Sequence, residues 1–531
     1  MAKFVTVEEA VSHVSDGMML TLGGFSTYGS PEELLEGLAA RYEKTGSPKN
    51  LTIVSGITPG DKSESHEPLK GYSVGLNRLR ADGLISAVII ALADARAIGY
   101  KINENKIAGY LLPMGALLNL IRASAGGAPG LLTKVGLGTY CDPRQEGCAV
   151  NELARQRGPI VELMEIDGQE CLLYKALKPD VCFIRGTYAD EDGNISIDHE
   201  AIIGAELDMA AAVRNNGGIV IVQVSEIVRR GTIPAKSVRF HKSFVDYIVK
   251  CDNPDNHRQC YITPKYRPEL TGQVRTVAGV AEPRKLDPRK VIARRGALEL
   301  RPGVMINLGV GMPDGVAAVA DEEGISSHVT LSVEAGPMGG TVQGGLAFPG
   351  TANAEAYYCQ TDILNMYDGG LLDMTFLGAA EVDEKGNVNV SKFAGRSGGP
   401  GGFIDISQNT KKVCFVGIFT AGKPKPDIEV ADGELRINSD GSEIKYVKEV
   451  QQVTYSGEYA VKRGQEVMYI SERSVFKLTP EGLMLMEIAP GVDMQKDVLD
   501  KMEFKPLISP DLKTMDSRIF RPERMGLDKE W

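Results

Sequence analysis

The fold is decided by the stretch Asp16-Gly-Met-Met-Leu-Thr-Leu-Gly-Gly-Phe25, which returns past the middle of the chain as Pro302-Gly-Val-Met-Ile-Asn-Leu-Gly-Val-Gly311. Each stretch is an apolar run that ends in a glycine turn. A helical pattern follows each turn, over residues 32–41 in the first copy and after Pro313 in the second. A strand, a glycine turn and a helix make the opening unit of a layered α/β domain. The sequence therefore predicts this unit twice.

Two further blocks recur in the same order. Residues 180–184 (DVCFI), followed by 189–194 (ADEDGN), match 373–377 (DMTFL), followed by 382–387 (VDEKGN). Residues 218–222 (GIVIV) then match 412–416 (KVCFV). Continuous apolar runs of this kind are typical of buried, mainly parallel strands. We therefore expect an α/β fold in which two related open α/β domains are fused in one chain.

A length of 531 residues is too great for a single hydrophobic core. The segments 262–272 and 282–288 are rich in proline and charge, as expected of a connector. We predict an amino-terminal domain over 1–275, a carboxyl-terminal domain over 288–531 and a linker at about 262–288. The proline-punctuated tail over 504–521 is expected to wrap a surface and to add no layer to the core.

Composition excludes several classes of function. A formal charge of −11 and a pI near 5.3 argue against a nucleic-acid surface, which requires concentrated positive charge. No run approaches the roughly 18 apolar residues of a membrane span, and the amino terminus lacks a basic segment followed by an apolar one. We expect a cytoplasmic protein with no membrane or nucleic-acid partner.

Cysteine and histidine spacing gives no metal or disulfide pattern. None of the 8 cysteines forms a C-x-x-C pair, and the 6 histidines lack the spacing of a zinc site. The cysteines are expected to be reduced packing residues, with Cys182 and Cys414 inside apolar strands. We predict that no metal is bound.

Glu334 is the first candidate for chemistry. It follows an apolar run over 329–333 and precedes a glycine-rich break over 335–340. Ligands of layered α/β proteins bind beyond the carboxyl ends of strands, so a carboxylate at this point is a candidate nucleophile. The alternative is a solvated carboxylate that only ends a strand. Glu334 needs support from its neighbours in the sequence.

Two glycine segments supply that support. Gly309-Val310-Gly311 ends a strand and opens a helix, so its N–H groups can face an anion. Its G-x-G-x-x-x-G spacing and internal proline argue against a dinucleotide loop. The segment 398–402 (GGPGG) either permits positive φ angles in a surface loop or exposes N–H groups as an oxyanion site. If the related domains meet face to face, the first glycine turn and Glu334 line a shared cleft.

These residues resemble a known family. The pattern over 16–31 is similar to the amino-terminal signature of family I coenzyme A transferases and departs from it only at Thr21, where an apolar residue is usual. The resemblance covers essentially the whole chain, including the strand before Glu334, the segment 401–406 (GGFIDI) and the segment 469–476 (YISERSVF). It is greatest for the fused acetate/propionate branch, which acts on short-chain acyl-CoAs.

The resemblance implies roles for individual residues. Glu334 matches the catalytic glutamate, which lies in a Glu-x-Gly context, whereas the 3-oxoacid branch has Ser-Glu-Asn-Gly. Val333 and Ala335 depart from that branch and favour simple monocarboxylates as substrates. The match also implies that the CoA-binding and oxyanion elements are Gly309, Val310, Gly311, Gly401 and Gly402. The N–H groups expected to face the oxyanion are that of Val310 and that of either Gly401 or Gly402.

The chemistry implied by the resemblance is ping-pong transfer through a glutamyl-CoA thioester. Coenzyme A is then a substrate that is held covalently during turnover, and no cofactor is bound permanently. The partners are acyl-CoA and short-chain carboxylates, in a homotetramer. Gly24, Phe25 and Tyr28 lie beside the first glycine turn and either shape the acid pocket or serve as core and rim residues.

Two other functions stay open on the sequence alone. An acyl-CoA hydrolase uses the same carboxylate and CoA site but admits water to the acylated intermediate. A non-catalytic metabolite-binding module is also built from α/β domains, and fold alone does not separate a binder from an enzyme.

Overall fold

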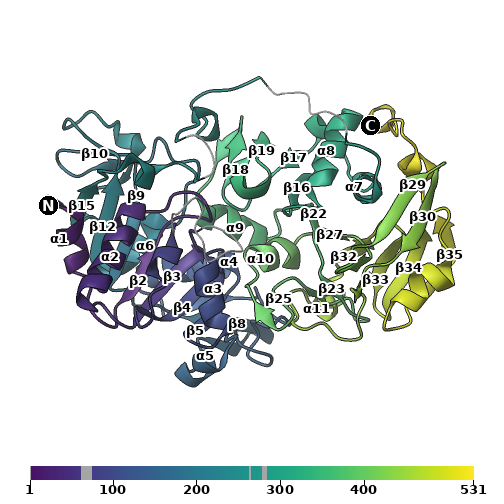
Figure 1. Ribbon diagram of the computed structural model, residues 1–531, viewed down its shortest axis with the longest axis horizontal. Helices are drawn as coiled ribbons and strands as arrows, with labels where there is room; N and C mark the ends of the chain where they lie inside the picture. The colour runs from purple at the N-terminus through teal and green to yellow at the C-terminus, as the bar shows by residue number, and fades with distance from the viewer. Residues whose placement is uncertain (1, 61–73, 262–264, 278–283) are drawn as a thin grey trace. The chain divides into compact units, whose positions relative to one another are not determined.

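The computed structural model describes residues 2–60, 74–261, 265–277 and 284–531 (Figure 1). Contacts divide the chain into two compact units. Unit 1 comprises Met1–Thr276, Glu334–Asn365 and Arg396–Asp405. Unit 2 comprises Val277–Val333, Met366–Gly395 and Ile406–Trp531. Each unit contains one sheet of eight strands, the first drawn in purple to teal and the second in green to yellow.

The large sheet of unit 1 has the order β1-β15-β12-β9-β2-β3-β4-β5, and its neighbouring strands are parallel. Its strands are β1 (Lys3–Phe4), β2 (Met19–Leu22), β3 (Leu51–Ile57), β4 (Ile85–Leu92), β5 (Ala108–Leu111), β9 (Val181–Arg185), β12 (Ile219–Val224) and β15 (Tyr247–Lys250). The helices are α1 (Val7–Ser12), α2 (Glu32–Thr45), α3 (Arg96–Asn103), α4 (Met114–Ala125), α5 (Glu152–Arg157) and α6 (Glu206–Asn215). Apolar residues of α1 and α2 form one core cluster with the central strands.

Unit 1 also contains smaller sheets, of which two have more than two strands. One consists of β6 (Gly130–Thr133), β8 (Gln169–Lys175) and β7 (Val161–Ile166). The other consists of β13 (Glu226–Val228), β10 (Tyr188–Asp190), β11 (Ile195–Ser196) and β14 (Val238–Phe240). The second sheet follows β9 and β12 along the chain, so it lies beyond the carboxyl ends of those strands.

The large sheet of unit 2 has the order β17-β16-β22-β27-β32-β33-β34-β35. Its strands are β16 (Met305–Leu308), β17 (Thr330–Leu331), β22 (Met374–Leu377), β27 (Lys412–Val416), β32 (Glu466–Ile470), β33 (Ser474–Thr479), β34 (Gly482–Ile488) and β35 (Leu507–Thr514). The first five are parallel, β33 is antiparallel to both β32 and β34, and β35 pairs with β34 in parallel. The helices α7 (Pro288–Ala297), α8 (Asp314–Glu323) and α11 (Gly457–Arg463) belong to this unit.

The predicted repeat is confirmed strand by strand, because β2, β9 and β12 are neighbours in unit 1 just as β16, β22 and β27 are in unit 2. One hydrogen bond recurs at the start of the paired strands. The amide of Met19 donates to Asp180 Oδ2 at 2.8 Å, and that of Met305 donates to Asp373 Oδ2 at 2.9 Å. The two units are related α/β domains, as the sequence predicted.

The matched acidic segments also adopt the same turn. Asp190 Oδ1 accepts the amides of residues 192 and 194, and the side chain of Asn194 donates to Asp190 Oδ2 at 3.0 Å. Asp383 Oδ1 accepts the amides of residues 385 and 387, and the side chain of Asn387 donates to Asp383 Oδ2 at 2.9 Å. The repeat therefore extends from the strands to the loops that follow them.

The compact units do not follow a single boundary along the chain. The repeat has its connector near 262–288, of which 262–264 and 278–283 lie outside the described residues. Packing also places 334–365 and 396–405 in unit 1, although both segments come from the carboxyl-terminal copy. Their backbones pair with unit 1 residues, as in the bonds from Gln360 N to Ile203 O at 2.8 Å and from Gly401 N to Ala91 O at 3.0 Å.

Two local expectations were wrong. The strand expected over 329–333 is only β17 (Thr330–Leu331), because the chain leaves the sheet after Ser332 donates to Ile306 O. The tail adds β35 to the sheet and contributes to the core, where an irregular surface wrap had been expected. Its buried residues in the unit 2 cluster are Met515, Ile519, Phe520, Met525 and Leu527.

None of the described helices is both long and apolar enough to cross a bilayer. All 8 cysteines are free thiols, and Cys182 and Cys414 are buried in β9 and β27, as predicted. Within the described residues no group of three or more His, Cys, Asp and Glu side chains is arranged to hold a metal ion.

Candidate active site

Glu334 follows the short strand β17. The amide of Ser332 donates to Ile306 O at 2.8 Å, and the side chain of Asn307 donates to Ser332 O at 3.1 Å. Val333 and Ala335 are buried on either side, whereas Glu334 is partly exposed. The buried neighbours fix the backbone, so the carboxylate between them is held in place at the end of the strand.

Gly336 explains the Glu-x-Gly pattern in physical terms. Its φ is +116°, a conformation that side chains disfavour. The amide of Tyr358 donates to Gly336 O at 3.0 Å, and a Cβ on Gly336 would lie 2.1 Å from the carbonyl oxygen of Tyr358. Only glycine permits this approach of two backbones. The turn that carries Glu334 is thereby held against residues 358–360.

The Gly309–Gly311 turn joins β16 to α8, as predicted. The amide of Gly309 donates to Phe376 O at 2.8 Å, and that of Gly311 donates to Asp314 Oδ2 at 2.9 Å. Burial raises the pKa of Asp314, and the Gly311 amide opposes this shift. Between these two amides, that of Val310 has no hydrogen-bond acceptor in the described part of the chain, and the Val310 side chain is 51% exposed. Of the three N–H groups, that of Val310 is available to a ligand.

The glycine segment before α10 (Phe403–Gln408) lies on the end of β4. A Cβ on Gly399 would lie 2.2 Å from Ala91 O, so glycine is required by a close backbone approach. The amide of Gly401 donates to Ala91 O at 3.0 Å, and Gly401 O accepts the amide of Met114 at 2.9 Å. The amide of Gly402 has no acceptor among the residues the structure describes. Gly401 is thus committed to the fold, and Gly402 has a free N–H.

The first glycine turn, at Gly24, Phe25 and Tyr28, is closed by two bonds between Phe25 and Tyr28, each 2.9 Å long. The hydroxyl of Tyr28 donates to Ala347 O at 2.7 Å. Burial raises the pKa of Tyr28, and the neighbouring thiol of Cys260 adds to the shift. Tyr28 is thereby bonded to the segment that begins at Glu334, in addition to forming part of a cavity wall.

That cavity lies beyond the carboxyl ends of β2 and β9 in unit 1, where ligands of α/β sheets bind. Its volume of ≈ 20 Å³ gives room for roughly one or two water-sized groups. It is lined by Gly24, Phe25, Tyr28, Gly29, Arg185, Ile197, Glu200, Ala201, Ile202, Glu206, Arg239, Phe240 and Gln360. The three residues predicted for an acid pocket therefore line one cavity together.

Charged side chains form much of the wall, and sequence reasoning missed them. Arg185 forms two bonds with Glu200, at 3.1 and 2.6 Å. Burial raises the pKa of Glu206, although Arg239 and the amides of Glu206 and Gly24 oppose the shift. Arg185 belongs to β9, Glu200 to a loop, Glu206 to α6 and Arg239 to β14, all far along the chain from Gly24. No spacing motif connects them. The signal that could have revealed them is their place at the end of β9 and in the segments that follow β9 and β12, where ligands of α/β sheets bind.

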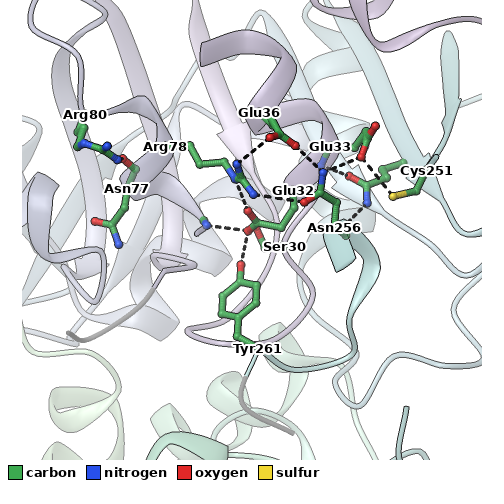
Figure 2. Close-up of polar contacts among 12 residues, drawn as sticks. Ser30, Glu32, Glu33, Glu36, Asn77, Arg78, Arg80, Cys251, Asn256 and Tyr261 are labelled. Carbon is green, nitrogen blue, oxygen red and sulfur yellow. Dashed lines mark hydrogen bonds and ion pairs between the residues drawn. The ribbon is translucent and has the colours of Figure 1, made fainter. Parts of the chain in front are cut away.

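A buried carboxylate also fixes the start of α2 behind the first glycine turn. Figure 2 shows Glu32 accepting hydrogen bonds from several neighbours. Ser30 Oγ, Gly75 N and Arg78 Nε each donate to it at 2.6 Å, and the hydroxyl of Tyr261 donates as well. Glu32 is 2% exposed, so these donors replace water. The sequence signal that could have revealed it is a Ser-Pro-Glu run at the start of a helix.

The predicted residues divide between the compact units. Gly24, Phe25, Tyr28, Glu334, Gly401 and Gly402 belong to unit 1, and Gly309, Val310 and Gly311 belong to unit 2. Unit 1 thus contains the Glu334 carboxylate on a rigid turn, the free amide of Gly402 and a small cavity with charged walls. This set is suited to acyl chemistry on a small anionic substrate.

Comparison with known proteins gives a consistent result. The family model described as "Coenzyme A transferase" matches residues 4–251. Caffeate CoA-transferase of Acetobacterium woodii is 42% identical, over 99% of this chain and 99% of its own. Acetate CoA-transferase YdiF of Escherichia coli O157:H7 is 40% identical, over 98% of this chain and 96% of its own. The solved thioester complex of YdiF with CoA has a TM-score of 0.90 and 39% identity, covering 99% of this chain and 97% of that one.

Proposed function

The chain belongs to the coenzyme A transferase family, and from this premise we propose that it transfers CoA between short-chain acyl-CoA thioesters and free carboxylates such as acetate and propionate. Glu334 is the residue that carries CoA. The observation behind the proposal is the turn at Glu334, where a partly exposed carboxylate stands between buried neighbours and before a glycine that nothing can replace. A nucleophile needs such a fixed position more than it needs high basicity.

The reaction then has two mirrored halves. A carboxylate oxygen of Glu334 attacks the acyl carbonyl, the C–S bond breaks, and CoA thiolate leaves a mixed anhydride. The thiolate attacks the glutamyl carbonyl, which releases the donor acid and forms a glutamyl-CoA thioester. The incoming carboxylate attacks that thioester, and the same steps run in reverse. No proton is gained or lost overall, because one carboxylate replaces another.

Each addition develops negative charge on a carbonyl oxygen, and backbone N–H groups are proposed to stabilise it. The free amide of Val310 supports its assignment as one donor. Of the two glycines left open by the sequence, Gly402 is favoured, because the amide of Gly401 is bonded to Ala91 O. A donor of this kind contributes about 10²- to 10³-fold to the rate.

The acid that this chain uses is proposed to be short. Its relatives carry names as different as acetate and caffeate CoA-transferase, so identity to them does not choose the acid. The cavity beside Phe25 and Tyr28 is small, with a volume of ≈ 20 Å³, which favours a short tail over a bulky one. Acceptor rates with acetate, propionate, butyrate, lactate, acetoacetate and caffeate would rank the substrates.

Hydrolysis of acyl-CoA is the competing activity at the same residues, and it would require water to reach the anhydride or thioester. CoA release is measured with and without an acceptor acid. Transfer predicts that acyl-CoA is consumed only when an acceptor is present. Equal consumption in both reactions would identify a hydrolase. Similarity to CoA-transferases over the whole chain argues against a non-catalytic module.

The experiment that tests the covalent step is intact mass spectrometry after incubation with acetyl-CoA and an acid quench. The wild type is expected to gain the mass of CoA less water, and the Glu334→Gln variant is expected to gain nothing. Peptide mapping should place the adduct on Glu334. An unmodified wild type that still exchanges CoA would overturn the proposal. Coenzyme A as a transient substrate, with no resident cofactor, and a homotetrameric assembly are further parts of the proposal, the latter to be checked by light scattering.

A further inference from the structure

The guanidinium group of Arg239 lies in a wall of the small cavity. Its Nη2 donates to Gly204 O at 3.3 Å and to Cys359 Sγ at 3.5 Å. Among the described residues no carboxylate forms a contact ion pair with it, and the Glu206 carboxylate of the same cavity interacts with it at longer range. An arginine has five N–H donors in a planar fork that matches a carboxylate. Most of the donor capacity of Arg239 therefore remains available.

Arg185, the second arginine of the cavity, has a structural role. Arg185 is buried and bonded twice to Glu200, and it also donates to Ser30 O at 3.2 Å and to Arg258 O at 2.8 Å. Its charge is neutralised and its N–H groups are used by the fold. Arg239 lines the same cavity without a contact ion pair and interacts with Glu206 at longer range, so of these two arginines it is the one with N–H groups left for an anion that enters from outside.

The remaining walls limit what that anion can be. Phe25, Ala201 and Phe240 are buried apolar residues of the lining, and the cavity has a volume of ≈ 20 Å³. A phosphate with an attached nucleoside does not fit roughly one or two water-sized groups. A carboxylate with a short apolar tail satisfies both the cation and the apolar wall. The chemical class that fits is a short-chain monocarboxylate.

The cavity wall is connected to the turn of Glu334 through three consecutive residues of unit 1. Tyr358 is bonded to Gly336, two residues after Glu334. Cys359 Sγ donates to Gly204 O at 3.3 Å, and Gln360, which lines the cavity, donates to Ile203 O. Two residues of extended chain span no more than about 7 Å. The turn of Glu334 is bonded to Tyr358 and Arg239 donates to the adjacent Cys359, so both are attached to one short segment.

We infer that Arg239 binds the carboxylate of the free acid substrate and presents it to the CoA ester of Glu334. This inference rests on the proposed function and adds the residue that recruits the acceptor. One carboxylate oxygen accepts from the guanidinium, and the second is left to attack the thioester carbonyl. The short tail lies against the apolar wall. Arg239 would then act in the half-reaction that uses the free acid and not in the one that uses acyl-CoA.

The test separates the half-reactions in Arg239→Gln, Arg239→Lys and the control Arg230→Gln, whose arginine is 68% exposed and paired with Asp192. In Arg239→Gln the KM for acetate should rise about 10- to 100-fold, the loss expected for a charge-assisted hydrogen bond. The KM for acetyl-CoA and the yield of the CoA adduct should stay unchanged. Arg239→Lys should recover part of the affinity for acetate, and Arg230→Gln should match the wild type.

Two other results would overturn the inference. An unchanged KM for acetate in a folded Arg239→Gln protein shows that the arginine does not bind the acid. A rise in the KM for acetyl-CoA alone shows that it binds a phosphate of CoA. Acetate binding to Glu334→Gln, followed by ligand-detected NMR with and without Arg239→Gln, involves no turnover. This binding measurement therefore tests Arg239 even if the covalent mechanism fails. The absence of a CoA adduct on the wild type would contradict the mechanism without bearing on Arg239.

Discussion

The carbonyl of Gly336 accepts the amide of Tyr358 at 3.0 Å, and the carbonyl of Tyr358 lies where a side chain on Gly336 would begin. The third position of Glu-x-Gly is therefore set by the meeting of two backbones. Glu334 itself needs no glycine nearby for its chemistry. The glycine of the motif therefore explains how the backbone beside the proposed nucleophile is held.

Gly336→Ala is expected to displace the turn and to lower activity strongly. The substitution combines a φ of +116° with a contact of 2.1 Å, so its cost should reach about 2 kcal/mol or more. Gly344→Ala is the matched control, since no atom lies within 4 Å of its added Cβ. Urea midpoints and exchange rates of the two variants check the prediction. Equal behaviour would show that the Glu334 turn relaxes without penalty.

Glu334→Gln should keep affinity for CoA while kcat falls by at least about 10³-fold, because the amide cannot form the anhydride. Glu334→Ala should be inactive as well, and should recover activity only if an external carboxylate takes the vacated position. Exchange between labelled acetate and acetyl-CoA measures both variants. Near-native exchange in Glu334→Ala would assign the nucleophile to another residue.

Gly402→Pro is predicted to fold and to lose about 10²- to 10³-fold in kcat, because proline removes one N–H at a position that precedes helix α10. Gly401→Pro should instead destabilise the protein, since its N–H is bonded to Ala91 O and its φ of +54° is closed to proline. Thermal midpoints separate the two effects. If Gly402→Pro exchanges CoA normally, the oxyanion is stabilised elsewhere.

Glu32→Gln should destabilise the protein by about 3 to 5 kcal/mol, because it leaves the buried guanidinium of Arg78 without its closest anion. Glu36→Gln provides the control. Glu36 lies 3.4 Å from the same guanidinium, but its side chain is 52% exposed, so its loss should cost less than about 1 kcal/mol. Urea unfolding of both variants measures the difference. Equal midpoints would mean that the Ser30, Gly75 and Tyr261 donors do not depend on charge at residue 32.

Lys445 gives a prediction about pH. Its Nζ donates to Ile418 O at 3.0 Å, and burial lowers its pKa to about 8 from the ordinary 10.5, with the Glu472 carboxylate opposing the shift. Between these two values the unfolded chain binds more protons than the folded one, so stability should rise with pH across that window. The gain, on the order of 2 kcal/mol, should vanish in Lys445→Met. Urea midpoints of the wild type and Lys445→Met, measured from pH 7 to about 10.5, test the sign. A wild-type midpoint that falls relative to the variant as pH rises would contradict the prediction.

The sequence was sufficient for the repeated architecture. Apolar runs before Gly23 and Gly309 became β2 and β16, and the matched acids Asp180 and Asp373 accept equivalent amides. These features are local, since each depends on residues within one strand and its turn. The sequence also predicts a class of site, and this stays a prediction, because a carboxylate and glycine turns lie in short segments that can be read as motifs.

Contacts between distant segments could not be predicted. Whether Gly401 or Gly402 offers a free amide depends on Ala91, more than 300 residues earlier in the sequence. Arg185 is paired with Glu200 and Arg239 is not, and no spacing in the sequence connects those three positions. The tail was misjudged for a similar reason. Its prolines suggested an irregular coil, but β34 offers an open edge with which β35 pairs.

The assignment of 334–365 and 396–405 to unit 1 has a consequence for biosynthesis. During translation the first 276 residues of that unit are synthesised before its other two segments. The nascent amino-terminal half must therefore wait with part of its surface uncovered, exposed to chaperones and to neighbouring chains. Its assembly ends only once residue 405 has left the exit tunnel.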